Sequence, residues 1–214
     1  AIDDATRTAL AESAVAAAVA AGYQNVGTLE FLVDGEGRYY FIEINARIQV
    51  EHPVTEMLSG IDIVAEQIRL ASGDPLGYGQ DDVRLRGHAI EFRINAEDVN
   101  ADFQPQAGTV ERYVPPGGAG IRMETHLYSG YEVPPYYDSL LGKLIVWGPD
   151  RDSAIARSRV ALRELLVEGI ETNISFHRAI LEDETFLAGG FDTNLLDRKG
   201  AAAFLSAVEP DEGA

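Results

Sequence analysis

The first third of the chain alternates between apolar and polar residues in patterns that predict a helix followed by a hairpin. Residues 4–21 are rich in alanine with scattered charges, which is typical of a helix. The runs Val26–Val33 and Tyr39–Ile44 are rich in β-branched and aromatic residues, and the glycine-containing segment 34–38 lies between them. Two such runs on either side of a short turn predict a β-hairpin.

The segment after the hairpin has no regular period. Residues 45–60 contain Pro53 and no repeating apolar stripe, so we expect a loop there, followed by a helix at 61–72. Asp74-Pro75 and nearby glycines then predict a boundary, and we expect residues 1–86 to form the first domain.

The second block, residues 87–198, alternates short β-rich runs with glycine and proline clusters and then turns helical. Its predicted strands are Gly87–Asn95, Thr109–Val114, Gly120–Tyr128 and Leu141–Trp147, and its predicted helices are Arg151–Leu166 and Asn173–Leu181. Residues 199–214 are small and acidic, which predicts a disordered tail. The fold class is therefore α+β, with mixed antiparallel sheets and flanking helices.

Composition limits the possible functions. The net charge of −18 argues against a nucleic-acid surface, because phosphates would be repelled. No apolar run is long enough to cross a membrane, and cysteine is absent, so we expect a cytoplasmic protein without disulfides. The chain begins at Ala1 inside an apparent helix, and we expect it to be part of a longer polypeptide.

The acids also far outnumber the bases. Thirty-five acids accompany 17 bases, of which only Lys143 and Lys199 are lysines. A halophilic source would explain this, and so would a GC-rich genome that favours alanine and arginine.

The hairpin carries the first candidate chemistry. If it pairs symmetrically about its turn, Glu30 lies opposite Glu43, and Asn45 shares their face because strand side chains alternate. Two facing carboxylates repel each other, and a divalent cation such as Mg²⁺ would remove that repulsion. A solvated face with screened charges is the structural alternative.

A polar row continues from the hairpin. Glu43, Asn45, Arg47, Gln49 and Glu51 are spaced by two, so an extended backbone would direct all five side chains the same way. The planar fork of Arg47 suits a small carboxylate-like anion such as bicarbonate, and Glu51 is placed to act as a general base. The alternative is the solvated end of a surface strand.

Several blocks in order resemble the biotin-dependent carboxylases. The sequence from Glu43 to Glu56, EINARIQVEHPVTE, is similar to the signature of that family. The similarity continues through RGHAIEFRINAED at 86–98, PPYYDS at 134–139 and GIETN at 169–173. Multiple blocks in sequence are far more specific than a single motif. The resemblance implies a partial ATP-grasp fold followed by a biotin carboxylase C-terminal domain.

The resemblance also implies roles at matching positions. Glu30, Glu43 and Asn45 would hold Mg²⁺ or Mn²⁺, and Arg47, Gln49 and the Val50 backbone would bind bicarbonate. Glu51 would deprotonate bicarbonate for attack on ATP. Arg93 would bind biotin and stabilise the oxygen that becomes negative on its ureido ring.

Cofactors and partners follow from the same resemblance. ATP, the metal, bicarbonate and biotin would be used with a biotin carboxyl carrier domain and carboxyltransferase subunits or domains. A homodimer would form through a surface near Arg122, where Ala119 replaces a bulky aromatic.

Two other functions stay open at this point. One is a non-catalytic module that holds a carboxylase assembly together, and the other is a fragment of a different ATP-grasp ligase. The lysines and the glycine-rich lid that grip ATP are missing from these residues, so we expect the 214-residue chain alone to be inactive.

Overall fold

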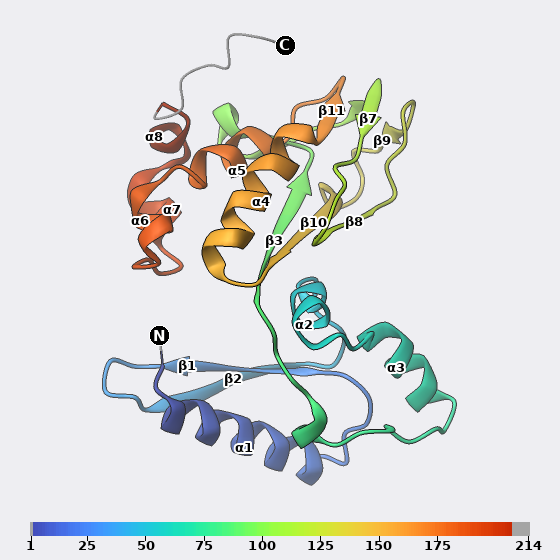
Figure 1. The fold of residues 1–214 in the computed structure, drawn as a ribbon, viewed down its shortest axis with the longest axis vertical. Coiled ribbons are helices and arrows are strands. Elements are labelled where there is room, and N and C mark those ends of the chain that lie inside the picture. The colour runs from blue at the N-terminus through green and yellow to red at the C-terminus, as the bar shows by residue number, and fades with distance from the viewer. Residues whose placement is uncertain (1, 207–214) are drawn as a thin grey trace. The chain divides into compact units, whose positions relative to one another are not determined.

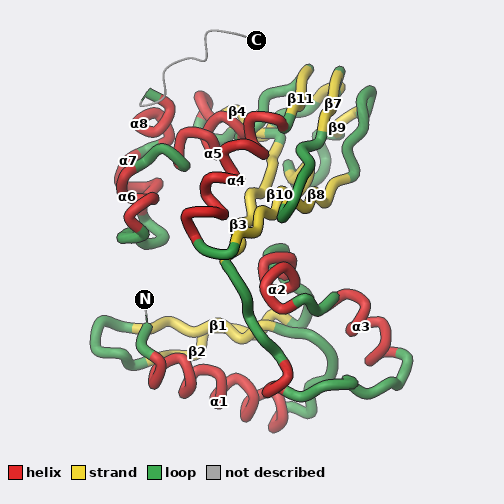
Figure 2. The backbone as a smooth tube through the Cα atoms, in the orientation of Figure 1, coloured by secondary structure: helices red, strands yellow, loops and turns green. Residues whose placement is uncertain are grey.

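The computed structural model describes residues 2–206, which divide between Arg84 and Leu85 into two compact units. Each unit combines antiparallel strands with helices, as Figures 1 and 2 show, and this confirms the predicted α+β class. In residues 2–206, no helix is both long and apolar enough to cross a bilayer.

The first unit consists of a helix, a hairpin and two shorter helices. Its elements are α1 (Asp4–Ala20), β1 (Thr28–Val33), β2 (Tyr39–Asn45), α2 (His52–Ser59), α3 (Ile63–Ala71) and the 3₁₀ turn Gln80–Asp82. Helix α1 lies along the hairpin in Figure 1, and Ser13 on α1 shares a 3.0 Å hydrogen bond with the Tyr39 hydroxyl on β2. The strands β1 and β2 pair only with each other among the described strands.

The hairpin turn closes as its sequence predicts. The Asp34 carboxylate accepts hydrogen bonds from the backbone N–H groups of Glu36 (2.9 Å) and Arg38 (3.0 Å), and Gly37 has a φ of 78°. A short aspartate side chain that bonds the backbone two residues on is a common turn device, and glycine adopts positive φ without strain.

Helix α2 corrects the loop predicted for residues 45–60. Pro53 lies in the first turn of α2, where its missing N–H has no helical partner to lose and its fixed φ already suits a helix. Gly60 ends the helix in the left-handed conformation, with a φ of 74°. The helix predicted at 61–72 is confirmed as α3, and Asp62 caps it by accepting from the Ala65 N–H at 2.8 Å.

The second unit contains the remaining elements. Its strands are β3 (His88–Asn95), β4 (Glu97–Asp98), β5 (Gln104–Pro105), β6 (Gly108–Thr109), β7 (Arg112–Val114), β8 (Ile121–Thr125), β9 (Glu132–Val133), β10 (Leu140–Gly148) and β11 (Leu166–Glu168). Its helices are α4 (Arg151–Glu164), α5 (Ile174–Ile180), α6 (Glu184–Ala188), α7 (Leu195–Lys199) and α8 (Ala201–Leu205), with a 3₁₀ turn at Val99–Ala101.

The main sheet of this unit has the order β3-β10-β8, and its strands are antiparallel. Helix α4 packs against one face (Figure 1), where the core joins Phe92 and Leu144 of the sheet to Leu162 of the helix. All three side chains are buried. Alternation along a strand therefore directs the intervening residues, such as Arg93 and Lys143, to the opposite face.

Two of the predicted strands are shorter or broken. The segment 109–114 is interrupted because the N–H of Val110 bonds to Tyr131 and that of Glu111 bonds to Glu168, so neighbouring residues pair with different partners. Strand β8 ends at Thr125, whose hydroxyl group accepts from the Leu127 N–H at 3.0 Å and donates to the Leu141 carbonyl at 2.7 Å.

The structure corrects the first part of the disordered tail predicted for 199–214, because residues up to 206 are folded. Helix α8 follows α7 directly, and Phe204 is only 2% exposed in a cluster with Phe176 and Leu195. An aromatic side chain with a packing partner gives even a small, acidic segment a reason to fold. The rest of the predicted tail, residues 207–214, lies outside the described part of the chain.

Candidate functional site

The two hairpin carboxylates face each other as predicted, but for a reason that symmetric pairing does not supply. Beside the turn Val33 pairs with Tyr39, and that register would place Glu30 opposite Ile42. A β-bulge at Ile42 shifts the pairing, so that Glu30 lies opposite Glu43. Without the bulge, Glu43 would move to the other face of the hairpin.

Asn45 bridges the facing carboxylates. Its Nδ2 donates to Glu30 Oε1 at 2.8 Å and to Glu43 Oε1 at 3.3 Å, so oxygens from both acids surround one small donor. This cluster of hard oxygen donors fits Mg²⁺ or Mn²⁺, which prefer carboxylate and amide oxygens. With a cation bound, the Asn45 amide would present its oxygen in place of its nitrogen.

The extended backbone assumed beyond Ile44 holds only as far as Asn45. Residues 46–50 form an irregular turn, and Glu51 has φ −83° and ψ 9° just before α2. The chain bends there because α2 begins at His52, soon after β2 ends at Asn45. The residues from Arg47 to Glu51 therefore do not form a straight row.

Hydrogen bonds nevertheless connect much of the predicted set. Arg47 Nη1 donates to Gln49 Oε1 at 2.9 Å and to the Ile48 carbonyl at 3.0 Å. Gln49 Nε2 in turn lies 3.4 Å from Glu30 Oε1, which completes a path from Arg47 to the facing carboxylates. We predicted that the alternation of a strand would bring these polar groups together, but the turn at residues 46–50 does so.

A hollow of about 240 Å³ adjoins this turn in the first unit. The polar residues Thr28, Gln49, Glu51, His52 and Thr55 line it together with the apolar residues Val26, Ile48 and Ile63. Glu51 is exposed at this hollow, and Val50 lies in the turn just before it. Gln49 and Glu51 therefore line the same hollow.

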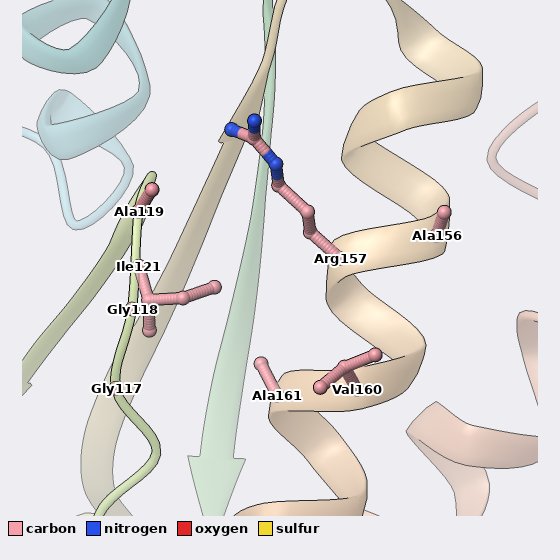
Figure 3. Close-up of a pocket in the computed structure, with 8 residues that line it drawn as sticks. All are labelled: Gly117, Gly118, Ala119, Ile121, Ala156, Arg157, Val160 and Ala161. Carbon is pink, nitrogen blue, oxygen red and sulfur yellow. The ribbon is translucent and has the colours of Figure 1, made fainter.

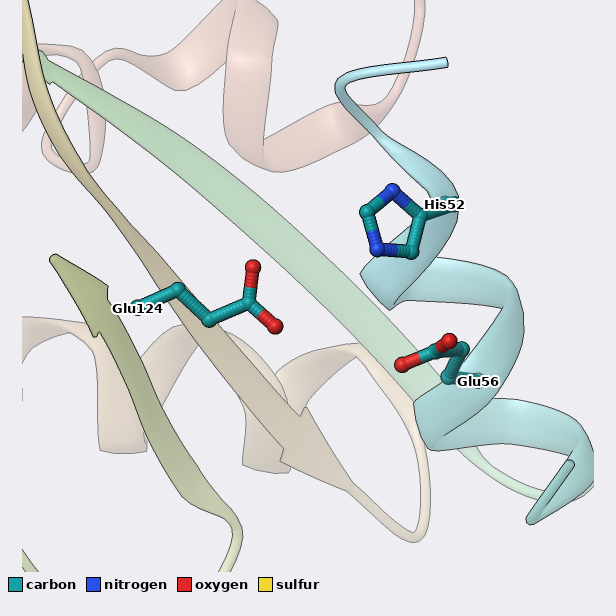
Figure 4. Close-up of side chains that lie close together, drawn as sticks. All are labelled: His52, Glu56 and Glu124. Carbon is teal, nitrogen blue, oxygen red and sulfur yellow. The ribbon is translucent and has the colours of Figure 1, made fainter. Parts of the chain in front are cut away.

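His52 has a structural partner. Its Nδ1 lies 2.7 Å from the Gln49 carbonyl, and because a carbonyl only accepts, Nδ1 carries the proton. On the same helix the Glu56 carboxylate accepts from the Ile63 N–H at 2.8 Å and ties α2 to α3. Figure 4 shows His52 and Glu56 on α2. These contacts favour the interpretation of His52 as a residue that orders the turn.

Arg93 lies on β3 in the second unit, within a row of charged residues that crosses the main sheet. Arg93 pairs with Lys143 of β10, and Lys143 pairs with Glu124 of β8. Lys143 Nζ lies 2.6 Å from Glu124 Oε2, and Arg122 contacts the other oxygen of the same carboxylate. Figure 4 shows the Glu124 side chain extending from its strand.

The charge of this row is partly balanced. Burial alone would raise the pKa of Glu124, but hydrogen bonds and charges from Lys143 and Arg122 outweigh it and lower that pKa. Like charges at directly opposite positions, such as Arg93 and Lys143, destabilise a sheet unless a counter-charge is near. The sequence did not single out Lys143 or Glu124, because only the strand register places them beside Arg93.

A second hollow, of about 350 Å³, lies between α4 and the segment that leads into β8 (Figure 3). Gly117, Gly118, Ala119 and Ile121 line one side, and Ala156, Arg157, Val160 and Ala161 line the other. The Arg157 guanidinium is held by the Trp147 carbonyl at 2.7 Å. The hollow is mainly apolar and contains none of the residues predicted to carry chemistry.

Family profiles match both units. The profile described as biotin carboxylase C-terminal domain matches residues 91–198, and that described as carbamoyl-phosphate synthase L chain, ATP binding domain, matches residues 1–78. The chain is 53% identical over 196 residues to biotin carboxylase of Nostoc sp. and 52% identical over 198 residues to biotin carboxylase 1 of Bacillus subtilis. Each match covers 92% of this chain and 44% of the relative.

Solved structures agree. The chain is similar to a Campylobacter jejuni biotin carboxylase in complex with β,γ-ATP, with 50% identity, a TM-score of 0.86 and coverage of 92% of this chain and 44% of that one. It is also similar to the bicarbonate-bound biotin carboxylase domain of a thermophilic 2-oxoglutarate carboxylase, with 47% identity, a TM-score of 0.89 and coverage of 95% and 46%. The chain thus spans less than half the length of these relatives.

Proposed function

This chain belongs to the biotin carboxylase family, and from that premise we propose that it supplies the metal, bicarbonate and biotin residues of an enzyme that carboxylates biotin with ATP and bicarbonate. The observation that carries the proposal is the cluster of Glu30, Glu43 and Asn45, which hydrogen bonds extend through Gln49 to Arg47. A paired carboxylate site beside an arginine fork suits a phosphoryl transfer to a small anion.

The proposed reaction begins at the turn before α2. Arg47, Gln49 and the Val50 backbone hold bicarbonate, and Glu51 takes its proton. A bicarbonate oxygen then attacks the γ-phosphorus of ATP, and the bond from that phosphorus to the ADP oxygen breaks. Mg²⁺ or Mn²⁺, held by Glu30, Glu43 and Asn45, supplies charge neutralisation for the phosphates.

The second half of the reaction uses the other unit. Carboxyphosphate splits into CO₂ and phosphate, the phosphate takes the proton from the ureido nitrogen of biotin, and that nitrogen bonds to CO₂. Arg93 stabilises the ureido oxygen while it carries negative charge, as a fixed guanidinium does for a developing oxyanion. The exposed side chain of Arg93 on β3 is consistent with this role.

The proposed partners follow from the substrates. Biotin would arrive on a carrier domain and leave for a carboxyltransferase subunit or domain, and two copies of the chain would meet near Arg122 and Ala119. The apolar hollow beside Ala119 supports a contact surface at this place. Similar solved structures include the biotin carboxylase subunit of a pyruvate carboxylase, which supports the proposal of further subunits as partners.

The direct test is an assay of a complete enzyme that contains this chain. ATP cleavage that requires both bicarbonate and biotin, with carboxybiotin formed in equal amount, is the expected result. ATP cleavage that ignores biotin but requires another carboxylate substrate would identify a different ATP-grasp ligase. A complete protein that binds its assembly partners but cleaves no ATP under any of these conditions would identify a structural module.

A further inference from the structure

Strand β3 lies at an outer position of the sheet β3-β10-β8, so one of its sides faces away from β10. The N–H and C=O groups on that side need partners, because unpaired backbone groups are costly when they are shielded from water. Arg93 and Asn95 present such groups next to the start of α5.

Asn173 pairs with this edge as a strand residue would. Its Nδ2 donates to the Arg93 carbonyl at 3.0 Å, and its Oδ1 accepts from the Asn95 N–H at 3.0 Å. Its own backbone N–H donates to the Asn95 carbonyl at 3.2 Å. One buried residue, 6% exposed, therefore makes three hydrogen bonds to two residues of β3.

His177, one turn further along α5, adds a fourth bond. Its Nε2 lies 2.9 Å from the Arg93 carbonyl, and because a carbonyl only accepts, Nε2 is the donor. The imidazole packs edge-on against Phe92, with ring centroids 5.3 Å apart. The Arg93 carbonyl thus receives two side-chain donors.

Asn173 precedes the first residue of α5, where an asparagine side chain usually caps the helix. Here that side chain makes no bond to the helix N-terminus, since both of its polar atoms are engaged on β3. The Asn173 side chain therefore stabilises the backbone of β3 at Arg93 and Asn95 and does not cap α5.

The position of these bonds suggests what they do. Phe92 and Ile94 are buried in the core, while the Arg93 side chain between them is exposed on the other face. Fixing the backbone at the Arg93 carbonyl and at Asn95 just after it restricts where the Arg93 guanidinium can reach. A charged group stabilises a transition state best when it is already in place, and a shift of about 1 Å is costly.

We propose that Asn173 and His177 are positioning residues that fix the backbone of Arg93 for its work on biotin, an inference that rests on the proposed function. Neither residue needs to touch biotin. Both side chains donate to the Arg93 carbonyl, so the loss of either side chain should slow the biotin step. The bicarbonate step should not change, because its proposed residues lie in the first unit.

The first test measures the hydrogen bonds that hold the backbone of Arg93 and Asn95, here called the clamp. It uses the 214-residue chain without any substrate. In Asn173→Ala, amide hydrogen exchange at Asn95 should become at least about tenfold faster, because its acceptor is gone. In Asn173→Asp the acceptor stays, so the Asn95 amide should remain protected. The amide of Ile145 in the central strand β10 serves as the internal reference. Unchanged exchange at Asn95 in Asn173→Ala would overturn the inference whatever the enzyme does.

The second test separates the donor at residue 177 from its ring packing, in a complete enzyme that contains this chain. His177→Phe keeps an aromatic ring beside Phe92 and removes the donor, whereas His177→Gln keeps an N–H that can reach the Arg93 carbonyl. We expect the ratio of biotin-dependent to biotin-independent ATP cleavage to fall about tenfold in His177→Phe and to recover in His177→Gln.

Arg93→Ala completes the design by showing whether His177 acts through Arg93. His177→Phe should cause no further loss in an Arg93→Ala background. An equal loss in that background would mean that His177 acts independently and would overturn the inference, with the role of Arg93 intact. If Arg93→Ala alone leaves the biotin step unchanged, the proposed role of Arg93 fails and the inference falls with it, while the exchange experiment still reports whether the clamp exists.

Discussion

At the scale of single residues, Glu51 offers a clear test of the proposed bicarbonate chemistry. Glu51→Gln keeps the shape of the side chain and removes its ability to take a proton. Because Glu30 and Glu43 are unchanged, the metal should still bind. We expect turnover of a complete enzyme to fall by at least about 100-fold, the usual scale for a general base, in steady-state assays at saturating bicarbonate.

A matched control comes from the hairpin turn. Glu36→Gln makes the same chemical change at an exposed carboxylate whose ion pair with Arg38 lies on the surface. It should leave turnover close to that of the unaltered enzyme. Equal turnover in Glu51→Gln and Glu36→Gln would show that another group takes the proton.

His177 gives a prediction for stability against pH. Burial lowers the pKa of His177, against the opposing effects of its bond to the Arg93 carbonyl and the charge of Glu97. The folded chain therefore favours the neutral ring, and the unfolded chain takes up the proton first as pH falls. The contribution of His177 to the free energy of unfolding is present in full above the unfolded-state pKa of about 6.5. As pH falls below that value, this contribution decreases by up to about 1.4 kcal/mol for each pH unit.

The measurement is urea unfolding at pH 7.5 and pH 5.5. The unaltered chain should lose more free energy of unfolding between these two pH values than His177→Gln, which keeps an N–H donor and does not titrate. Other ionisable groups contribute equally to both proteins and cancel in the comparison. The same loss in both would mean that His177 titrates normally in the folded chain.

At the scale of elements, sequence patterns identified the long elements and missed what depends on register. The hairpin, α3 and the long strand β10 are runs of residues with a clear strand or helix composition, and they were predicted correctly. Sequence patterns did not predict helix α2, because its segment lacks a period and contains Pro53, although proline in a first turn is favourable. Strands of two or three residues, such as β4 and β9, are too short to show any period.

The candidate site was predictable to the same extent. The facing of Glu30 and Glu43 was predicted from symmetric pairing, which in fact places Glu30 opposite Ile42. The bulge that brings Glu43 into this position has no sequence signature here. The hydrogen bond from Asn173 to Arg93 joins residues 80 positions apart, so only the folded chain reveals it. Alternation could not place Gln49 beside Glu30, because a turn, and not a strand, connects them.

The bulge itself can be tested by deletion. Removing Ile42 lets the register beside the turn continue without interruption, and Glu43 then falls opposite Glu30 with no bulge. Ile42 is more than half exposed, so little packing is lost. We expect the deletion variant to bind Mn²⁺ within about threefold of the unaltered chain in titrations, because the oxygen donors are unchanged.

Glu43→Gln in the same titration is the reference for a damaged site, since it removes one carboxylate and keeps the bulge. A deletion variant that binds Mn²⁺ as weakly as Glu43→Gln would show that the bulge itself, and not the pairing register alone, determines where the ligand side chains point.

At the scale of the whole molecule, the charge of −18 predicts a response to salt. Self-repulsion opposes the compact state, and the Debye length falls from about 10 Å at 0.1 M salt to about 3 Å at 1 M. If repulsion limits stability, the thermal midpoint should rise clearly between these two concentrations of KCl, as followed by circular dichroism. A flat or falling midpoint would leave only a codon-bias explanation for the composition.

The lone pairing of β1 with β2 has a consequence for how molecules meet in solution. Each strand has one side that no described strand covers, and Leu32, Tyr40, Phe41 and Ile42 are all more than half exposed nearby. Such edges invite addition of a strand from another copy, and the negative charge acts as a colloidal barrier against that encounter. Salt that relieves repulsion within one molecule also lowers the barrier between two, so concentrated KCl favours both folding and clustering.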